Sequence, residues 1–264
     1  MPSEGVPAEA HGPSRPLIDA HAHIWASPTA SWQRRPPGLT VLLNSTGMDD
    51  LESTWERATG DRPGSLLFAG LHPTNPNRDI VAFGRWVESH AAEVDGVGEI
   101  GLDRRVSLAE SRGDFLTQME LASRLKKPVT VHTRGRLQEA LDDLSTFDLR
   151  VLLHWFEGSL KELESCTDRG YFVSFGPPLL YSKKIKKLLA AAEMGSLLLE
   201  TDSPVRYGAC FESRDSSPLL IASVYLEAAR IMKVQPRELE RLLDRNAASF
   251  LGRAVGGRLA LQEE

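Results

Sequence analysis

Short apolar segments alternate with amphipathic patterns along the chain from Leu17 onward. The apolar segments predict eight strands, over residues 17–24, 40–45, 66–72, 96–102, 128–133, 150–156, 171–176 and 196–202. Apolar residues that recur at helical spacing predict helices over residues 48–60, 79–94, 114–127, 136–144, 159–167, 183–192, 216–232 and 236–250. Strands that alternate with helices are typical of βαβ units and a parallel sheet. Eight such units in 264 residues favour a (β/α)8 TIM barrel, a fold of the α/β class.

The connection between the first two predicted strands differs from the others. Its sequence, WASPTASWQRRPPG (25–38), contains three prolines and no helical periodicity, so we expect a proline-rich loop in place of the first crossover helix. The barrel is predicted to occupy residues 17–252, between a disordered amino-terminal tail at 1–16 and a carboxyl-terminal tail at 253–264. A doubly wound open sheet is the alternative architecture.

The composition is that of an ordinary globular protein. The chain is 41% hydrophobic and 25% charged, with a formal net charge of −5, and no basic excess points to nucleic-acid binding. The two cysteines, Cys166 and Cys210, fit a reducing compartment better than a disulfide scaffold, so a cytoplasmic location is expected. No apolar run reaches the roughly 18 residues of a membrane span, so none is expected.

Candidate metal ligands lie at or near the carboxyl ends of predicted strands. They are His21, His23, Glu99, His132, His154 and Asp202. Imidazole and carboxylate ligands suit zinc, manganese or magnesium at a hydrolytic site, whereas a structural zinc site would be built mainly from clustered cysteines. In a closed parallel barrel these strand ends converge on one mouth, where active sites of this fold are built. The sequence therefore predicts a metal-dependent hydrolase.

The first strand carries an unusual row of polar residues. Side chains two residues apart point to the same side of a strand, so Asp19, His21 and His23 should form one row, opposite a face of Leu, Ala and Ile. Burying these groups without partners would cost several kcal/mol, so a cation or a hydrogen-bond network is expected to satisfy them. Trp25 and Trp155, next to His23 and His154, offer stacking surfaces for a base or a sugar. The same alternation places both on the face opposite the ligands, however, so packing against helices is the expectation.

A set of motifs along the chain resembles one known family. The motifs are LIDAHAHI (17–24), GLHP (70–73), VGEIGLD (97–103), FLTQMELASRLKKPVTVHTR (115–134), LLHWFEGS (152–159), GYFVSFGP (170–177), LLETDSP (198–204) and LLDRNAASFLG (242–252). Together they are similar to the TatD family of metal-dependent hydrolases, within the amidohydrolase superfamily. This resemblance covers about residues 17–252. It implies a (β/α)8 barrel, one or two divalent metal ions (Zn, Mg or Mn), and phosphodiesterase activity on DNA, as a deoxyribonuclease or 3′–5′ exonuclease.

The resemblance also implies roles for individual residues. One metal ion would be bound by His21 and His23 and the other by His132 and His154, with Glu99 as the bridge and Asp202 as ligand and base. The predicted catalytic residues are Asp202, Glu99 and His72. From its local sequence alone, Asp202 could instead cap a helix in front of Pro204. Glu200 shares the strand face of Asp202 and is expected to lie behind the ligands.

Substrate contacts are predicted from side chains at the mouth. His72 closes the third strand and is expected to contact a phosphate or a leaving group, with a structural turn histidine as the alternative. Arg104, Arg105 and Arg134 could clamp phosphate oxygens or remain solvated loop charges. Trp32, on the proline-rich loop, is the candidate for stacking on a base. The lysine-rich segment 182–187 is either a solvated helix face or a track for a nucleic-acid backbone.

Several stretches at the mouth depart from the family pattern. They are the proline-rich loop, Arg104 in place of the aromatic residue that follows G-L-D, and Ser217-Pro218 where Asn-Glu-Pro is expected. DNA or a nucleotide is nevertheless the expected substrate, because Glu99 stands where related barrels often carry a carboxylated lysine. A hydrolase of lactones, esters or amides is one alternative, and a non-catalytic binding protein on the same scaffold is another.

Overall fold

The computed structural model describes residues 17–24 and 38–255, and its centre is one eight-stranded parallel sheet. The strands are β1 (Ile18–Ala22), β2 (Thr40–Asn44), β3 (Ser65–Ala69), β4 (Val94–Gly101), β5 (Val129–His132), β6 (Val151–Leu153), β7 (Phe172–Phe175) and β8 (Leu197–Leu199). Each strand pairs in parallel with the next one along the chain, from β1 to β8. All eight predicted strands are therefore confirmed.

Backbone hydrogen bonds join the end of the sheet to its beginning. Beyond β8, the Asp202 N–H donates to the His21 carbonyl at 2.9 Å, and the His23 N–H donates to the Ser203 carbonyl at 2.7 Å. Ala22 and Ser203 also form a parallel bridge. The strands thus circle back on themselves as a TIM barrel, and the open, doubly wound alternative is wrong.

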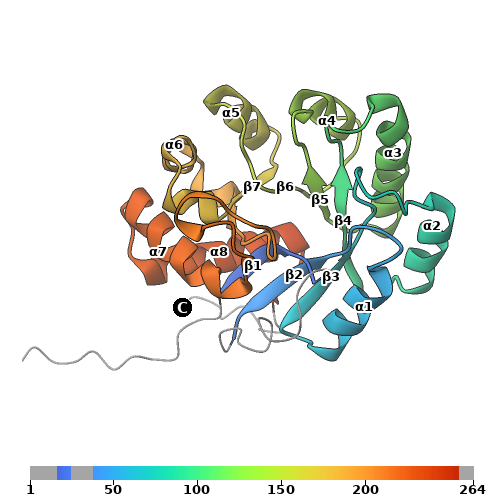
Figure 1. Cartoon of the computed structure of the whole chain (residues 1–264), viewed down its shortest axis with the longest axis horizontal. Helices are drawn as coiled ribbons and strands as arrows, with labels where there is room; N and C mark the ends of the chain where they lie inside the picture. Colours follow the sequence, from blue (N-terminus) through green and yellow to red (C-terminus); the bar gives the residue numbers. More distant parts are fainter. Residues whose placement is uncertain (1–16, 25–37, 256–264) are drawn as a thin grey trace, which may run out of the picture.

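The described part of the chain contains eight α-helices arranged around the strands (Figure 1). They are α1 (Leu51–Gly60), α2 (Ile80–Ser89), α3 (Leu108–Leu125), α4 (Leu137–Leu144), α5 (Leu160–Asp168), α6 (Lys183–Ala191), α7 (Ile221–Met232) and α8 (Pro236–Leu251). Short 3-10 helices are η1 (Pro177–Leu180), η2 (Met194–Ser196), η3 (Ala209–Phe211) and η4 (Pro218–Leu220). Among these described elements, no helix combines the length and the apolar character needed to cross a bilayer. The proline-rich stretch at 25–37, with both Trp25 and Trp32, lies outside the described residues, as do 1–16 and 256–264.

Two helices begin five or six residues away from their predicted starts. α3 begins at Leu108 instead of residue 114, because the Ser107 side chain caps it by accepting a hydrogen bond from the Glu110 N–H at 3.3 Å. α7 begins at Ile221 instead of residue 216, because the residues just before it form the separate 3-10 helix η4.

Three strands end three residues earlier than predicted, which changes where the polar residues that follow them lie. β3 ends at Ala69, β6 at Leu153 and β8 at Leu199. Trp155 and Asp202 have φ angles of 45° and 46°, values that lie outside the extended region and that a continuing strand does not contain. The candidate site residues near β6 and β8 therefore lie on the turns that follow the strands.

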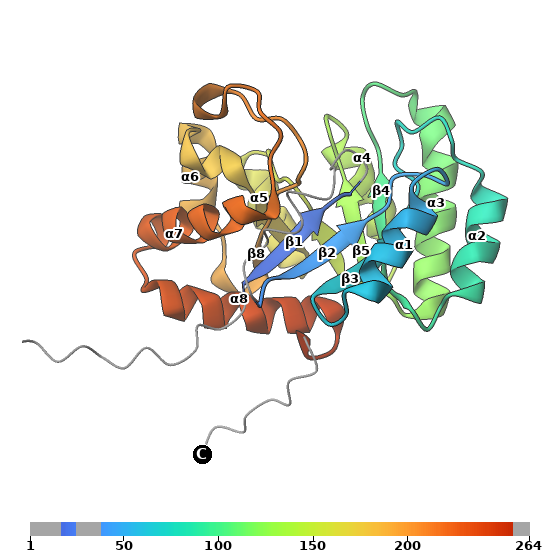
Figure 2. The same ribbon diagram turned by 60° about the horizontal axis from the view of Figure 1, so that its bottom comes forward.

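Helix α8 closes the barrel at the end opposite the mouth. It lies across the amino-terminal ends of the strands (Figure 2) and packs on strand side chains. This inner apolar cluster consists of Ile18, Ala20, Leu42, Leu66, Phe68, Leu152, Phe172, Leu198, Ala247, Phe250, Leu251 and Val255. The Phe250 ring stacks on Phe68 with 5.8 Å between centroids and meets the Phe172 ring edge at 5.7 Å.

Truncation of Phe250 should reveal how much the packing of α8 on the strands contributes to the stability of the fold. We expect Phe250→Ala to lower the free energy of unfolding by about 3–5 kcal/mol, because the side chain is fully buried and its loss leaves a cavity. Leu226→Ala, a truncation at a 60% exposed position of α7, should stay within about 0.5 kcal/mol. Urea denaturation of both variants measures the difference, and equal effects would contradict a closing role for α8.

Candidate metal centre

The six predicted ligands come together at the carboxyl ends of the strands. His21 lies in β1 and Glu99 in β4, whereas His132 is the last residue of β5. The others follow β1, β6 and β8 directly or within three residues: they are His23, His154 and Asp202. All are buried except His132, which is partly exposed. Residues separated by as many as 181 positions thus share one site, because parallel strands bring their ends to one edge.

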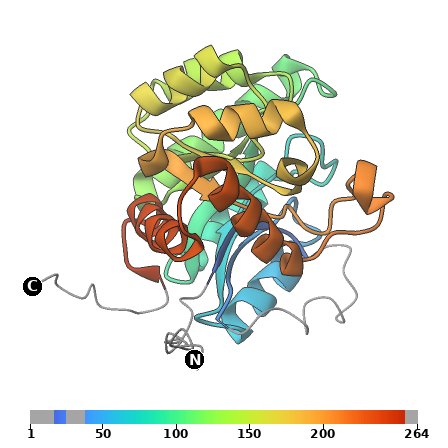
Figure 3. The same ribbon diagram turned by 90° about the vertical axis from the view of Figure 1, so that its left-hand side faces the viewer.

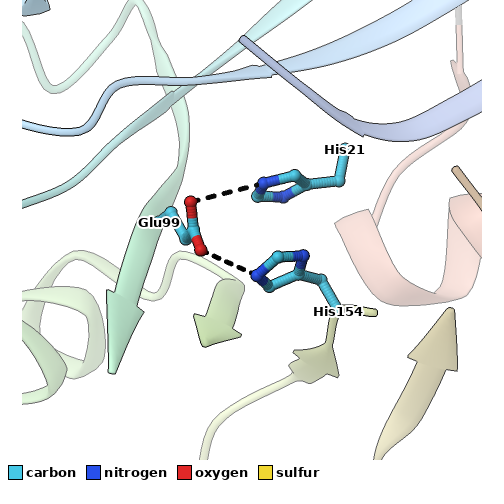
Figure 4. A group of neighbouring side chains, drawn as sticks. All are labelled: His21, Glu99 and His154. Atoms are coloured by element: carbon cyan, nitrogen blue, oxygen red, sulfur yellow. Dashed lines mark hydrogen bonds and ion pairs between the residues drawn. The ribbon is translucent and has the colours of Figure 1, made fainter. Parts of the chain in front are cut away.

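Glu99 lies at the centre of this cluster, with its two oxygens facing different histidines. Oε2 lies 3.5 Å from His21 Nε2 and 3.2 Å from His23 Nε2. Oε1 lies 2.7 Å from His154 Nε2 and 2.9 Å from His132 Nδ1. Figure 4 shows the Glu99 carboxylate beside the imidazoles of His21 and His154, with one oxygen toward each ring. Glu99 therefore joins two groups of potential ligands.

Asp202 completes the group around the first two histidines. Its Oδ1 lies 3.6 Å from His21 Nε2 and 3.4 Å from His23 Nε2. The alternative role as a helix cap is wrong, because the next helical element, η3, begins only at Ala209. Its positive φ turns the chain after β8 so that the side chain faces the barrel mouth.

His72 approaches the same centre from the turn after β3. Its Nε2 lies 3.4 Å from Glu99 Oε1, and its ring is 4.5 Å from that of His132. Its Nδ1 accepts a hydrogen bond from the Thr74 N–H at 3.2 Å, so the neutral ring carries its proton on Nε2. Sequence reasoning placed His72 at the mouth but did not count it among possible ligands, although the same strand-end signal applied to it.

Hydrogen bonds from surrounding groups orient two of the imidazoles. His23 Nδ1 lies 2.8 Å from the Asn44 carbonyl and must donate to it, so Nε2 is the nitrogen turned toward Glu99 and Asp202. His132 Nε2 lies 2.9 Å from Asp103 Oδ2, so Nδ1 is the nitrogen turned toward Glu99. Arg105 holds Asp103 in turn, with its Nη2 2.8 Å from Oδ2. Such outer partners fix the tautomer and direction of metal-binding imidazoles.

The predicted polar row on β1 is interrupted by an irregularity. The register of β1 against β2 shifts between Asp19 and Ala22. Ala20 packs in the inner apolar cluster with α8, whereas Ala22 packs in the larger apolar cluster that joins the strands to the surrounding helices. Two residues that alternation places on the same side of the strand thus pack in different clusters, so strict alternation was a wrong expectation here. His21 and His23 still converge, with their Nε2 atoms 3.1 Å apart, but Asp19 accepts hydrogen bonds from the Thr201 N–H and hydroxyl.

The buried Glu99 carboxylate is held in its ionised form by its neighbours. Burial alone would raise its pKa, but the charges of His72 and His154, with hydrogen bonds from His132 and His154, hold the pKa well below its ordinary value. Burial would lower the pKa of His154, but the Glu99 carboxylate raises it to about 9. For His21, burial and the adjacent His154 lower the pKa to about 3. The ionised Glu99 carboxylate thus favours positive charge on the groups that surround it.

This donor set fits divalent cations. Three groups have donor atoms within 4.8 Å of one another: His21, Glu99 and His154; His21, His23 and Asp202; and His72, Glu99 and His132. All their donors are imidazole nitrogens or carboxylate oxygens, the ligands of zinc, manganese and magnesium hydrolase sites. Protonated imidazoles or bound cations would supply the positive charge that the buried carboxylates require.

A wide cleft opens above the cluster. It has a volume of about 1500 Å³, and both Arg104 and Arg134 line it. Their guanidinium groups have no hydrogen-bond or ion-pair partner within residues 17–24 and 38–255, and the Arg104 N–H donates to the Arg134 carbonyl at 3.0 Å. Gly135, at φ 66°, lets the Arg104 side chain lie against it, since a Cβ there would be 2.7 Å from Arg104 Cδ. Arg105 differs because its guanidinium is bound to Asp103.

The structure also places Trp155 and the lysine-rich segment 182–187 relative to the cleft. Trp155 lines the cleft and stacks on Tyr207, so the prediction that it packs against helices was wrong. The strand ends at Leu153, and the positive φ of Trp155 removes the alternation on which that prediction rested. In the lysine-rich segment, Lys184 reaches the cleft and donates to the Glu157 carbonyl, whereas Lys186 pairs with Glu227 of α7 at 2.6 Å.

A closed parallel barrel with clustered imidazoles and carboxylates at its carboxyl-terminal mouth defines a metal-dependent hydrolase. The family described as "TatD related DNase" matches residues 18–252. The chain belongs to this TatD family, whose members include enzymes that act on ester bonds.

Individual relatives span most of the chain. The metal-dependent hydrolase YjjV of Escherichia coli (strain K12) is 29% identical over 250 residues, which cover 87% of this chain and 95% of YjjV. A crystal structure of YjjV superposes with a TM-score of 0.80 at 25% identity, covering 89% of this chain and 97% of that structure. The 3'-5' ssDNA/RNA exonuclease TatD of Klebsiella pneumoniae (strain 342) is 26% identical over 232 residues, 82% of this chain and 88% of the exonuclease.

Proposed function

We propose that this hydrolase is a phosphodiesterase that cleaves DNA or nucleotide phosphodiesters with one or two divalent ions (Zn, Mg or Mn). The observation that carries the proposal is the position of Glu99, whose two oxygens face separate groups of imidazoles. With the surrounding imidazoles, this carboxylate would hold one or two divalent cations, which would stabilise charge on the attacking and leaving oxygens of a phosphodiester. The name of the Klebsiella pneumoniae relative, an exonuclease on single-stranded DNA and RNA, supports nucleic acid as the substrate class.

The residues of the cluster would have different roles in hydrolysis. When bound, divalent cations lower the pKa of water and offset the charge that develops on phosphate oxygens. His21, His23, His132, His154 and Glu99 would hold them. Asp202, which borders both the first two histidines and the cleft, would position the attacking water and accept its proton on the carboxylate. His72 would donate a hydrogen bond from Nε2 to the phosphate or the leaving oxygen.

Positively charged side chains at the rim of the cleft favour an anionic substrate. Arg104 and Arg134 lie side by side without carboxylate partners among the described residues, so both guanidinium groups are available to phosphate oxygens. Arg105 is a weaker candidate, because it would have to leave Asp103, but its side chain is 53% exposed and retains donors that face solvent. Trp32 stays a predicted stacking residue.

The test is hydrolysis of a single-stranded oligonucleotide by protein loaded separately with Zn²⁺, Mg²⁺ or Mn²⁺. We expect progressive shortening with at least one of these metals and its loss after chelation, with recovery when the metal is returned. Bound metal and cooperative unfolding are measured in the same samples. Turnover of lactones, esters or amides without cleavage of any phosphodiester would instead support the amidohydrolase-type alternative. A folded, metal-loaded protein that turns over none of these substrates would support a binding protein.

A further inference from the structure

Trp155 lies directly after His154 and has an unusual backbone conformation. Its φ of 45° is uncommon for a bulky residue and persists only where the surroundings fix it. Here its N–H donates to Oε1 of the buried Glu200 at 2.7 Å, and Oε2 of Glu200 accepts from the Ser174 hydroxyl at 2.6 Å. The turn after β6 is thus held so that the indole stands at the cleft, next to a candidate metal ligand.

Contacts of the indole ring with neighbouring side chains also hold it in place. It stacks on Tyr207 with 5.3 Å between centroids and an interplanar angle of 26°. Tyr207 is 3% exposed, and its hydroxyl donates to the Thr201 carbonyl at 2.7 Å. Trp155 Nε1 donates to Glu157 Oε1 at 3.0 Å, while Phe211 packs beside Tyr207 at 5.9 Å. Tyr207 and Phe211 belong to the orange segment after β8, which projects from the body of the molecule in Figure 3.

We infer that Trp155 is a stacking platform for an unpaired nucleobase next to the phosphodiester that is cleaved. This inference rests on the proposed phosphodiesterase function and adds a specific contact, the residue on which a base of the substrate would stack. A partly exposed aromatic ring that is fixed in advance offers a flat surface that any base can cover. Bases inside a duplex have their faces covered by their neighbours and would have to unstack first. The platform therefore favours strands with an exposed base over abasic strands and duplexes. The phosphate beside that base would lie at the metal centre.

The test compares binding of three fluorescein-labelled thymidine oligonucleotides with phosphorothioate linkages that slow hydrolysis. One is an intact single strand, one has abasic sites at its 3′ end, and one is a duplex. Trp155→Asn removes the rings and keeps a residue type that tolerates positive φ, whereas Trp155→Phe keeps an aromatic face. Trp86→Asn is the matched control, since Trp86 lies on α2 against His90 and does not line the cleft.

Fluorescence anisotropy should show that Trp155→Asn weakens binding of the intact strand by about 5- to 150-fold, with a smaller loss for Trp155→Phe. Binding of the abasic strand should already be weak in the wild type and unchanged by either substitution. Metal content and melting temperature should match the wild type, and Trp86→Asn should bind as the wild type does.

Contrary results separate the two proposals. Equal weakening of intact and abasic strands, or no weakening of either, would overturn the platform while leaving the phosphodiesterase in place. Cleavage of bis(p-nitrophenyl) phosphate without binding of any oligonucleotide would do the same. Failure of the metal-loaded wild type on every phosphodiester would overturn both.

Discussion

Replacement of Glu99 by glutamine is expected to lower kcat/KM for phosphodiester hydrolysis by at least about 1000-fold, because the activated nucleophile depends on bound metal. Glu99 is the residue that faces both groups of histidines, through Oε2 toward His21 and His23 and through Oε1 toward His132 and His154. A neutral amide has one oxygen and one NH2 group, so it cannot serve both groups as a ligand and removes a charge that they require. We therefore also expect fewer metal ions per chain.

Metal content by elemental analysis and initial rates with oligonucleotide substrate measure this effect. Glu120→Gln is the matched control, because it makes the same change on the exposed surface of α3 and should alter neither quantity. A Glu99→Gln protein that keeps full metal content and more than a tenth of the wild-type rate would contradict the proposal that this carboxylate holds metal.

Replacement of Asp202 by asparagine should lower the rate of the chemical step by about 100- to 10,000-fold, the usual range for loss of a general base. Asparagine is nearly the same size and also tolerates the left-handed conformation, so φ of 46° should be retained. The amide oxygen can still approach His21 and His23, but the side chain no longer accepts a proton. Metal content should accordingly fall less than in Glu99→Gln.

Single-turnover kinetics with saturating enzyme separate the chemical step from substrate binding. Asp168→Asn, at an exposed position at the end of α5, is the matched control and should behave as the wild type. A rate for Asp202→Asn within tenfold of the wild type, with unchanged metal content, would remove Asp202 from the proton-transfer step and leave it as a ligand at most.

The barrel could be predicted because its signals are local. The apolar segments and the helical patterns each depend on neighbouring residues, so all eight strands and eight helices were found within a few positions of their observed bounds. The cluster of imidazoles and carboxylates at the mouth could be predicted for a related reason. A polar residue at the end of a buried apolar strand, such as His132 after PVTV, is seldom needed for packing. In a parallel barrel, the carboxyl ends of all strands lie at the same mouth, so such residues should meet there.

The errors arose where the chain leaves regular structure. Alternation along a strand placed Trp155 among the helices, but a positive φ ends β6 and turns the ring into the cleft. A shift in register on β1 likewise separated Asp19 from His21 and His23, which alternation had placed in one row. His72 joined the ligand cluster because the turn after β3 folds toward Glu99, and no pattern in the sequence measures that distance.

By itself, the sequence determined the order and kind of the elements, the imidazoles and carboxylates at the strand ends, and membership of a hydrolase family, since all of these depend on residue identity and short-range spacing. Only the tertiary structure decided that one oxygen of Glu99 faces His21 and His23 and the other faces His132 and His154. It also decided that Arg104 and Arg134 stay unpaired within the described chain, whereas Arg105 binds Asp103. Finally, it placed Trp155 at the cleft, beside His154. These facts depend on the directions of side chains from strands distant in sequence. Such directions are set by closure of the barrel and by the φ angles of its turns, which no local pattern encodes.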